Sequence, residues 1–258
     1  MAKLAQLFLT LCLLSFCCNA SEPLSETSNR ILFFHIPKTG GTTLFSILKN
    51  GLHLPPQNET WHYAIDKDRE IFLKLKLVSG HFFYSQFLNI QGSRITILRD
   101  PVQHAISEHW WWVSLAKSRD QFYKDHYLPP GDPLETVTNH QCLFLSSFDP
   151  RDATIPIEKH LESAKYNLEH DFFFVGITED LENGIRALCR QLNLPVPNTI
   201  PKINRTRGSK IFPDDVVQKI RERNWADYEL YRFAKELYEN KFSRTKGNFR
   251  QPQGNHSF

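Results

Sequence analysis

The chain has 258 residues, of which 41% are apolar and 23% are charged, a globular composition that excludes general disorder. Its 31 Lys and Arg residues stand against 28 Asp and Glu, which gives a formal charge of +3. So small an excess provides no ground for a nucleic-acid partner, although it is compatible with an anionic ligand in a local basic cleft. A chain of this length is long enough for one sizeable core, and we expect a single domain.

The first twenty residues have the features of a secretory signal peptide. Lys3 precedes an apolar run from Leu4 to Cys18, and Asn19-Ala20 then offers a small residue before Ser21. A short membrane anchor is the alternative, although the run of about 15 residues is below the roughly 20 that span a bilayer. We therefore expect contact with a membrane only if residues 1–20 are uncleaved, and a flexible lead-in over residues 21–30.

Short apolar runs alternate with helical patterns along the rest of the chain. The predicted strands are 31–36, 75–79, 95–98 and 172–176. The predicted helices are 42–49, 66–76, 101–116, 156–168, 181–192, 213–223 and 225–239. Loops are expected at 55–60, 127–133 and 194–212, and a polar tail at 241–258. Alternating strands and helices indicate an α/β domain over residues 31–240, with a mostly parallel sheet flanked by helices.

The segment from His35 to Thr43 reads His-Ile-Pro-Lys-Thr-Gly-Gly-Thr-Thr and lies between the first strand and the first helix. The backbone N–H groups of such a turn, with the positive end of the helix, bind phosphate-like anions. Gly40 and Gly41 allow close backbone approach, and Lys38 adds a cation. Hydroxyl donors come from Thr39, Thr42 and Thr43. An ordinary turn capped by threonine is the alternative.

Because Lys38 precedes the glycines, this segment differs from the Gly-x-x-x-x-Gly-Lys-Ser/Thr loop of ATP-using enzymes. A second segment, Ile95-Thr96-Ile97-Leu98-Arg99-Asp100-Pro101, is a strand that ends in an arginine, and Ser107 lies two turns into the next helix. A guanidinium and a hydroxyl in these places can hold one phosphate between them. An Arg99–Asp100 surface arrangement with a solvent-facing serine is the alternative.

The two segments, in this order, resemble the sulfotransferases, and most of all the Golgi carbohydrate O-sulfotransferases of the heparan-sulfate 2-O and 6-O kind. The resemblance covers roughly residues 31–240. It implies a P-loop-like fold and an enzyme that moves a sulfuryl group from 3′-phosphoadenylyl sulfate (PAPS) to a carbohydrate hydroxyl. A glycosaminoglycan-like acceptor fits this resemblance, and no metal is required.

The resemblance also assigns binding residues. It implies that Lys38, Thr39, Gly40, Gly41, Thr42 and Thr43 bind the 5′-phosphosulfate, and that Arg99 and Ser107 bind the 3′-phosphate. Asn204, Arg205 and Lys210 fall in a segment that resembles the family's loop over the nucleotide. With Lys202 and Arg207 they form a basic loop, for which contact with an anionic acceptor and simple exposure to solvent are the alternatives.

Two residues are candidates for catalysis. In-line displacement at sulfur depends chiefly on positioning and charge stabilisation, and Lys38 is placed to stabilise charge on the bridging oxygen. The acceptor hydroxyl needs a general base, and histidine is suited to that task near neutral pH. Of the eleven histidines we select His81, because it follows a predicted strand end. A structural imidazole that caps the strand is the alternative.

Other side chains near these segments have open interpretations. His35 is a candidate supporting group, and His104 and His109 share the helix of Ser107. The run Trp110-Trp111-Trp112 offers stacking surface for a sugar, but a core position is the stronger interpretation for any one of the three. Cys142 and Cys189 are the cysteines left after the signal, and they form either a disulfide or two buried thiols.

Rival hypotheses remain for the function. They are a tyrosyl-protein sulfotransferase, a P-loop kinase-like nucleotide-binding protein, and a binding module without catalysis. The export signal favours the Golgi lumen, with secretion as the alternative. Asn58-Glu59-Thr60, Asn204-Arg205-Thr206 and Asn255-His256-Ser257 match glycosylation acceptors.

Overall fold

The computed structural model describes residues 30–54, 59–61, 75–117, 138–201, 203 and 211–247. The predicted signal peptide and most of the lead-in lie outside these residues. So do Asn204, Arg205 and Lys210, and the asparagines of all three glycosylation triplets. Among the helices of the described ranges, none has the length and apolar character needed to cross a membrane.

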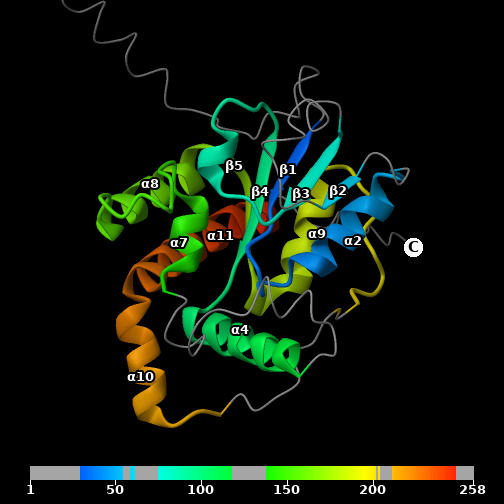
Figure 1. The fold of residues 1–258 in the computed structure, drawn as a ribbon. Coiled ribbons are helices and arrows are strands. Elements are labelled where there is room, and N and C mark those ends of the chain that lie inside the picture. The colour runs from blue at the N-terminus through cyan, green and yellow to red at the C-terminus, as the bar shows by residue number, and fades with distance from the viewer. Residues whose placement is uncertain are drawn as a thin grey trace, which may run out of the picture.

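Five parallel strands form the centre of the fold (Figure 1). They are β1 (Ile31–Phe34), β2 (Glu59–Trp61), β3 (Leu77–Gly80), β4 (Ser93–Leu98) and β5 (Phe172–Ile177). Their order in the sheet is β2-β3-β1-β4-β5, and every neighbouring pair is parallel. All four residues of β1 are buried, as expected of an apolar strand covered on both faces. The prediction of an α/β fold with a parallel sheet is confirmed.

Helices cover both faces of the sheet. One face packs against α2 (Gly41–Gly51) and α9 (Leu181–Gln191), with Phe33 of β1 and Leu48 of α2 fully buried between the layers. The other face packs against α7 (His140–Leu145), α8 (Ile157–His170) and α11 (Trp225–Gly247), where Phe34 of β1 meets Leu230 of α11 in one apolar cluster. Alternate residues of β1 thus point to opposite layers, which is the two-residue period of a strand.

The remaining two helices lie at one end of the sheet. Figure 1 shows α4 (Pro101–Ala116) beneath the strands and α10 (Asp214–Arg223) beside it. Val102 and Ile106 of α4 pack against Ile220 of α10 in a third, smaller cluster. Pro101 occupies the first turn of α4, and the side chain of Asp100 accepts a hydrogen bond from Gln103 N at 2.9 Å. Both features are N-terminal signals, and the predicted bounds of this helix are confirmed.

Three predictions differ from the structure, and one helix was not predicted. Residues 59 and 60, expected in a loop, begin β2, and the six-residue helix α7 was not predicted. Both elements are too short to show a clear period. Helix α11 continues to Gly247, past the predicted end at residue 239. Leu75 and Lys76, expected at the end of a helix, are not helical, and residues 66–74 lie outside the described part.

Cys142 and Cys189, the cysteines of the described residues, are buried free thiols. Cys142 belongs to the apolar cluster on the α7 side of the sheet, and Cys189 belongs to the cluster on the α9 side. The sheet separates them, so the disulfide alternative is wrong.

Candidate active site

Four strands bring polar side chains to one edge of the sheet. Lys38 lies four residues after β1, His81 directly follows β3, and Arg99 directly follows β4. Thr178 directly follows β5. The carboxyl ends of parallel strands meet at the same edge, which is where open α/β sheets bind ligands. The structure therefore brings three residues predicted from distant parts of the sequence to one place.

The carbonyl groups of the loop after β1 are held by side chains. Ile36 O accepts from Thr39 Oγ1 at 2.8 Å, and Pro37 O accepts from His104 Nε2 at 2.8 Å. The next two carbonyls accept from residues of other strand ends: Lys38 O from Arg99 Nη1 at 2.9 Å, and Thr39 O from Thr178 Oγ1 at 2.7 Å. The N–H of a planar trans peptide points away from its C=O, so the anchored carbonyls of Pro37, Lys38 and Thr39 leave the N–H groups of the following residues directed away from these partners. This geometry suits an anion.

The glycines of the loop are required by its conformation and its neighbours. Gly40 has a φ of 89°, in the left-handed region, and it precedes the first turn of α2. A Cβ on Gly41 would lie 1.9 Å from Cδ2 of His35. Lys38 has a φ of 62°, which is unusual for a residue with a side chain. Such strain is typical of sites where the surroundings impose the backbone geometry.

Arg99 is fixed by a neighbour that sequence reasoning missed. Arg99 N donates to Gln141 Oε1 at 2.9 Å, and Arg99 O accepts from Gln141 Nε2 at 2.8 Å. Gln141 is fully buried in α7. While Nη1 holds the loop, the buried Arg99 Nε finds no acceptor among the described residues. An N–H with no acceptor of its own can bind an anionic oxygen. Ser107, predicted to share this task, is 3% exposed on α4.

His81 is oriented by the backbone. Its Nδ1 lies 2.6 Å from His35 O, and because a carbonyl can only accept, Nδ1 carries the proton. The other ring nitrogen, Nε2, is then the basic one. Burial lowers the pKa of His81, an effect that the charges of His140 and Lys38 reinforce. The ring of His35 lies 4.5 Å from that of His81, and burial lowers the pKa of His35 well below its ordinary value.

Lys38 lies beside an exposed aromatic ring. Its Nζ is 5.6 Å from the ring centre of Trp111, which is 36% exposed. Trp110 instead packs against the cluster of α4 and α10, as the core interpretation expects, whereas the exposed ring of Trp111 is open to stacking with a sugar. Burial lowers the pKa of Lys38, and Glu108 opposes that effect.

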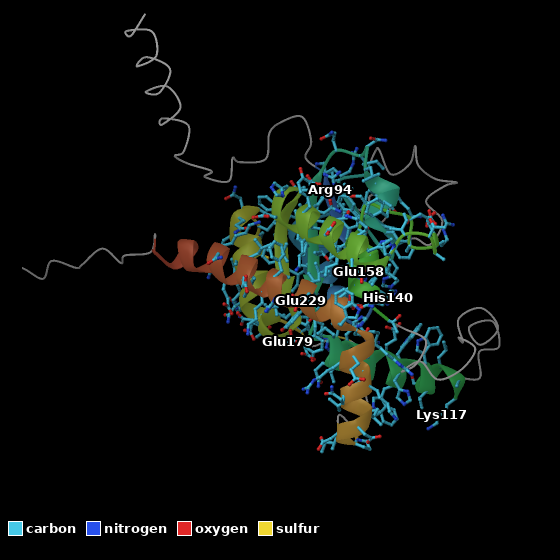
Figure 2. The ribbon with its side chains drawn as sticks, turned by 90° about the vertical axis from the view of Figure 1, so that its left-hand side faces the viewer. Arg94, Lys117, His140, Glu158, Glu179 and Glu229 are labelled. Atoms are coloured by element: carbon cyan, nitrogen blue, oxygen red, sulfur yellow. The ribbon has the colours of Figure 1, made fainter. Side chains whose placement is uncertain are left out.

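A buried carboxylate lies between two imidazoles next to Lys38. Glu108 Oε2 is 3.9 Å from His104 Nε2 and 3.6 Å from His140 Nδ1. His140 opens α7 where that helix approaches α4, and Figure 2 shows its position. Burial raises the pKa of Glu108, but the contact with His140 and the charges of His104 and Lys38 outweigh this effect and lower it to about 2. Burial lowers the pKa of His104 to about 4, so this ring is neutral near pH 7.

Sequence reasoning missed Glu108, His140 and Gln141. Glu108 follows His104 by four residues, a spacing that places both on one face of a helix and was visible in the sequence. His140 and Gln141 lie on the unpredicted helix α7, so no signal connected them with the site. Thr178 was visible only as a residue next to the last strand.

Together, the parallel sheet, the loop with anchored carbonyls and the cations at the strand ends define an α/β protein with a loop whose geometry suits an anion. No protein-family model matches the chain. In sequence, the chain is related to the sulfotransferases, near the heparan-sulfate 6-O-sulfotransferases.

The relatives match most of this chain. The zebrafish (Danio rerio) heparan-sulfate 6-O-sulfotransferase 1-B is 27% identical, over 82% of this chain and 66% of the relative. The chicken (Gallus gallus) heparan-sulfate 6-O-sulfotransferase 2 is 26% identical, over 81% of this chain and 66% of the relative. The human (Homo sapiens) heparan-sulfate 6-O-sulfotransferase 2 is 27% identical, over 81% of this chain and 44% of the relative. The chain thus spans less than two thirds of the length of these proteins.

Among solved structures, the mouse sulfotransferase SULT7A1 complexed with PAP is similar with a TM-score of 0.36 and 16% identity. The similarity covers 77% of this chain and 66% of that chain. So low a score carries no conclusion about the fold.

Proposed function

We propose that this chain is a PAPS-dependent sulfotransferase that transfers a sulfuryl group to a carbohydrate hydroxyl. The observation that carries the proposal is the meeting of Lys38, Arg99 and His81 around a loop whose carbonyls are anchored in the protein. The relationship to proteins named heparan-sulfate 6-O-sulfotransferases supports the donor and the class of acceptor.

The loop residues 38–43 and Arg99 fit the donor's two anionic groups. In this proposal, the N–H groups of the loop and the hydroxyls of Thr42 and Thr43 bind the 5′-phosphosulfate. The 3′-phosphate binds Arg99 Nε–H and the hydroxyl of Ser107. Lys38 keeps its positive charge and stabilises the negative charge that develops on the bridging oxygen. Asn204, Arg205 and Lys210, outside the described residues, are proposed to cover the nucleotide.

His81 acts as the general base in this proposal. Its Nε2 takes the proton of the acceptor hydroxyl as the acceptor oxygen bonds to sulfur. The bond between sulfur and the phosphate oxygen breaks, and that oxygen leaves with the electron pair. The Nδ1–H bond to His35 O keeps the ring in the tautomer that this step requires, and it supports the imidazolium that forms. Trp111 offers an apolar ring beside Lys38 against which a sugar can stack.

We propose action in the secretory pathway, in the Golgi lumen or after secretion, on a glycosaminoglycan-like acceptor. The apolar N-terminal run motivates the compartment, and the relatives motivate the acceptor class. The donor is a soluble nucleotide, so the proposal requires a supply of PAPS in that compartment.

The test measures transfer of labelled sulfate from PAPS to a panel of glycans and tyrosine peptides, with donor binding measured by calorimetry. We expect transfer to a glycan, and a loss of about 100-fold to 10,000-fold in His81→Asn. Lys38→Ala should lose about 100-fold to 1,000-fold. The matched control is His170→Asn, because His170 lies at the exposed end of α8.

The outcomes separate the rivals. Absence of PAPS binding would sink the proposal. Transfer to tyrosine peptides alone would replace the acceptor class. Donor binding without transfer to any acceptor, unchanged in His81→Asn, would favour a binding module, and ATP-dependent phosphate transfer would favour the kinase-like alternative.

A further inference from the structure

Three potential metal ligands converge between α4 and α7. They are His104 and Glu108, one helical turn apart on α4, and His140 at the start of α7. The ligand atoms of all three lie within 4.8 Å of one another. His104 and Glu108 are almost fully buried, whereas the side chain of His140 is 24% exposed. The cluster is therefore preformed, with an entrance at His140.

The separations fit a shared ion better than direct bonds. Glu108 Oε2 lies 3.6 Å from His140 Nδ1 and 3.9 Å from His104 Nε2, both too long for hydrogen bonds. Ligands at about 2.0–2.1 Å from a tetrahedral zinc ion are separated by about 3.4 Å. A contraction of a few tenths of an ångström would bring Glu108 Oε2 to ligand distance from both imidazoles. The two imidazole nitrogens, which lie within 4.8 Å of each other, would close on the ion by rotation of the His140 ring.

Two of the three ligand atoms have no hydrogen bond to give up among the described residues. Glu108 Oε2 and His140 Nδ1 are buried, and neither has a hydrogen-bond partner among the described residues. Burial lowers the pKa of His140, but Glu108 outweighs this effect and raises it, so zinc must displace a proton from this ring. His104 Nε2, in contrast, donates to Pro37 O. Coordination through this nitrogen would move the ring proton to Nδ1 and end that hydrogen bond, which opposes zinc binding. The nearby ammonium of Lys38 also opposes a second cation.

We propose that His104, Glu108 and His140 form a Zn²⁺ site with two imidazoles, one carboxylate and an open fourth position. Two histidines and a glutamate are a ligand set that zinc accepts, and zinc tolerates a water or another ligand in the fourth place. The affinity is weaker than that of a closed structural zinc site, because Lys38 lies close by.

The site is inhibitory, a point that rests on the proposed function. Ligation of His104 releases Pro37 O, the carbonyl that precedes Lys38 in the anion loop. Zinc and the nucleotide then favour different positions of the loop, and each weakens the binding of the other.

The test titrates tag-free full-length protein with Zn²⁺ by calorimetry, first without nucleotide. We expect one ion per chain, and with Co²⁺ in its place the intense visible bands of a four-coordinate ion. Glu108→Gln and His140→Gln should each weaken zinc binding by at least about 100-fold, since even outer-shell partners of a metal contribute about 10-fold to 100-fold. His170→Gln, which removes an exposed imidazole of α8, should bind zinc like the native protein.

Thermal melting of each variant checks its fold, and the half-buried His140 provides a second variant if Glu108→Gln fails to fold. Absence of zinc binding, a six-coordinate Co²⁺ spectrum, or unchanged affinity in folded His140→Gln would overturn the site. A second titration with 3′-phosphoadenosine 5′-phosphate tests the coupling, and an unchanged nucleotide Kd at saturating zinc would overturn inhibition. Failure of nucleotide binding without zinc would contradict the proposed function and leave the zinc site standing.

Discussion

Single positions in the loop after β1 are set by what surrounds them. Lys38 keeps a left-handed backbone although it has a side chain, because its carbonyl is held by Arg99 and the preceding carbonyl by His104. A backbone so constrained is already ordered before a ligand binds, which lowers the entropic cost of binding. The loop's shape thus depends on residues that are more than sixty positions away in the sequence.

We expect Gly41→Ala to abolish donor binding and to lower the free energy of unfolding by about 1–3 kcal/mol, the cost of overpacking. The added Cβ would meet the buried ring of His35. The backbone carbonyl of the same residue accepts the hydrogen bond from His81. Gly184→Ala is the matched control, because its Cβ would meet neighbours at 3.6 Å or more inside α9. Urea unfolding measures the stability of both variants, and calorimetry measures their binding of 3′-phosphoadenosine 5′-phosphate. Equal behaviour of the two would contradict a tightly packed loop.

In the proposed function, the pH dependence of transfer follows from His81. A general base must be neutral, and burial lowers the His81 pKa below its ordinary 6.5. Protonation, and with it the loss of activity, therefore occurs only when the pH falls below about 6.5, and the rate stays level through neutral pH. On the alkaline side, loss of the Lys38 proton reduces the rate, at a pH below 10.5 because burial lowers that pKa too. The check is kcat/KM for the acceptor at saturating donor, and an acid limb with a pKa above 6.5 would contradict it.

At the scale of elements, α7 and α11 are joined by side chains that bond backbone groups at the helix starts. Asn139, which precedes α7 with a φ of 50°, accepts from Ala226 N at 3.0 Å and Asp227 N at 3.2 Å in the first turn of α11. Asp227 in return accepts from Gln141 N at 3.1 Å and Cys142 N at 2.8 Å in the first turn of α7. This junction places Gln141 where it holds Arg99.

We expect Asn139→Gly to lower the free energy of unfolding by about 1–3 kcal/mol, because two buried N–H groups lose their acceptor. Glycine keeps the left-handed backbone, so the change isolates the side chain. Asn193→Gly is the control: Asn193 has a φ of 54° after α9, but it is exposed, and its change should be within about 0.5 kcal/mol. Urea unfolding measures the loss of stability in both variants. Equal losses would contradict a stabilising role of the Asn139 side chain between α7 and α11.

Element boundaries were predictable where local signals were strong. Asp100-Pro101 marked the start of α4, and the apolar period of α9 marked its length. Helix α7 was not predicted, because its six residues complete fewer than two turns and show no clear period. Its start also depends on Asp227, which belongs to another helix. The cluster of His104, Glu108 and His140 was not predicted either, since His140 approaches Glu108 only once α7 is in place.

At the scale of the whole molecule, the sheet divides the core into two apolar layers and keeps the two thiols apart. We expect reductant to leave the melting temperature unchanged, because Cys142 and Cys189 are free thiols on opposite sides of the sheet. The measurement is a thermal melt with and without dithiothreitol. A fall of several degrees in reductant would show a covalent link and contradict the two-layer arrangement.

The sequence by itself determined the α/β class, and the places of the glycine-bearing loop and of Arg99 at strand ends, because each depends on neighbours within a few residues. It also selected His81 from eleven histidines through its place after a strand. The tertiary structure decided which tautomer His81 adopts, which carbonyls hold the loop and which tryptophan faces Lys38. It also decided that Glu108 lies between two imidazoles. These features depend on contacts between residues tens of positions apart, which only the packing of the sheet and its helices brings together.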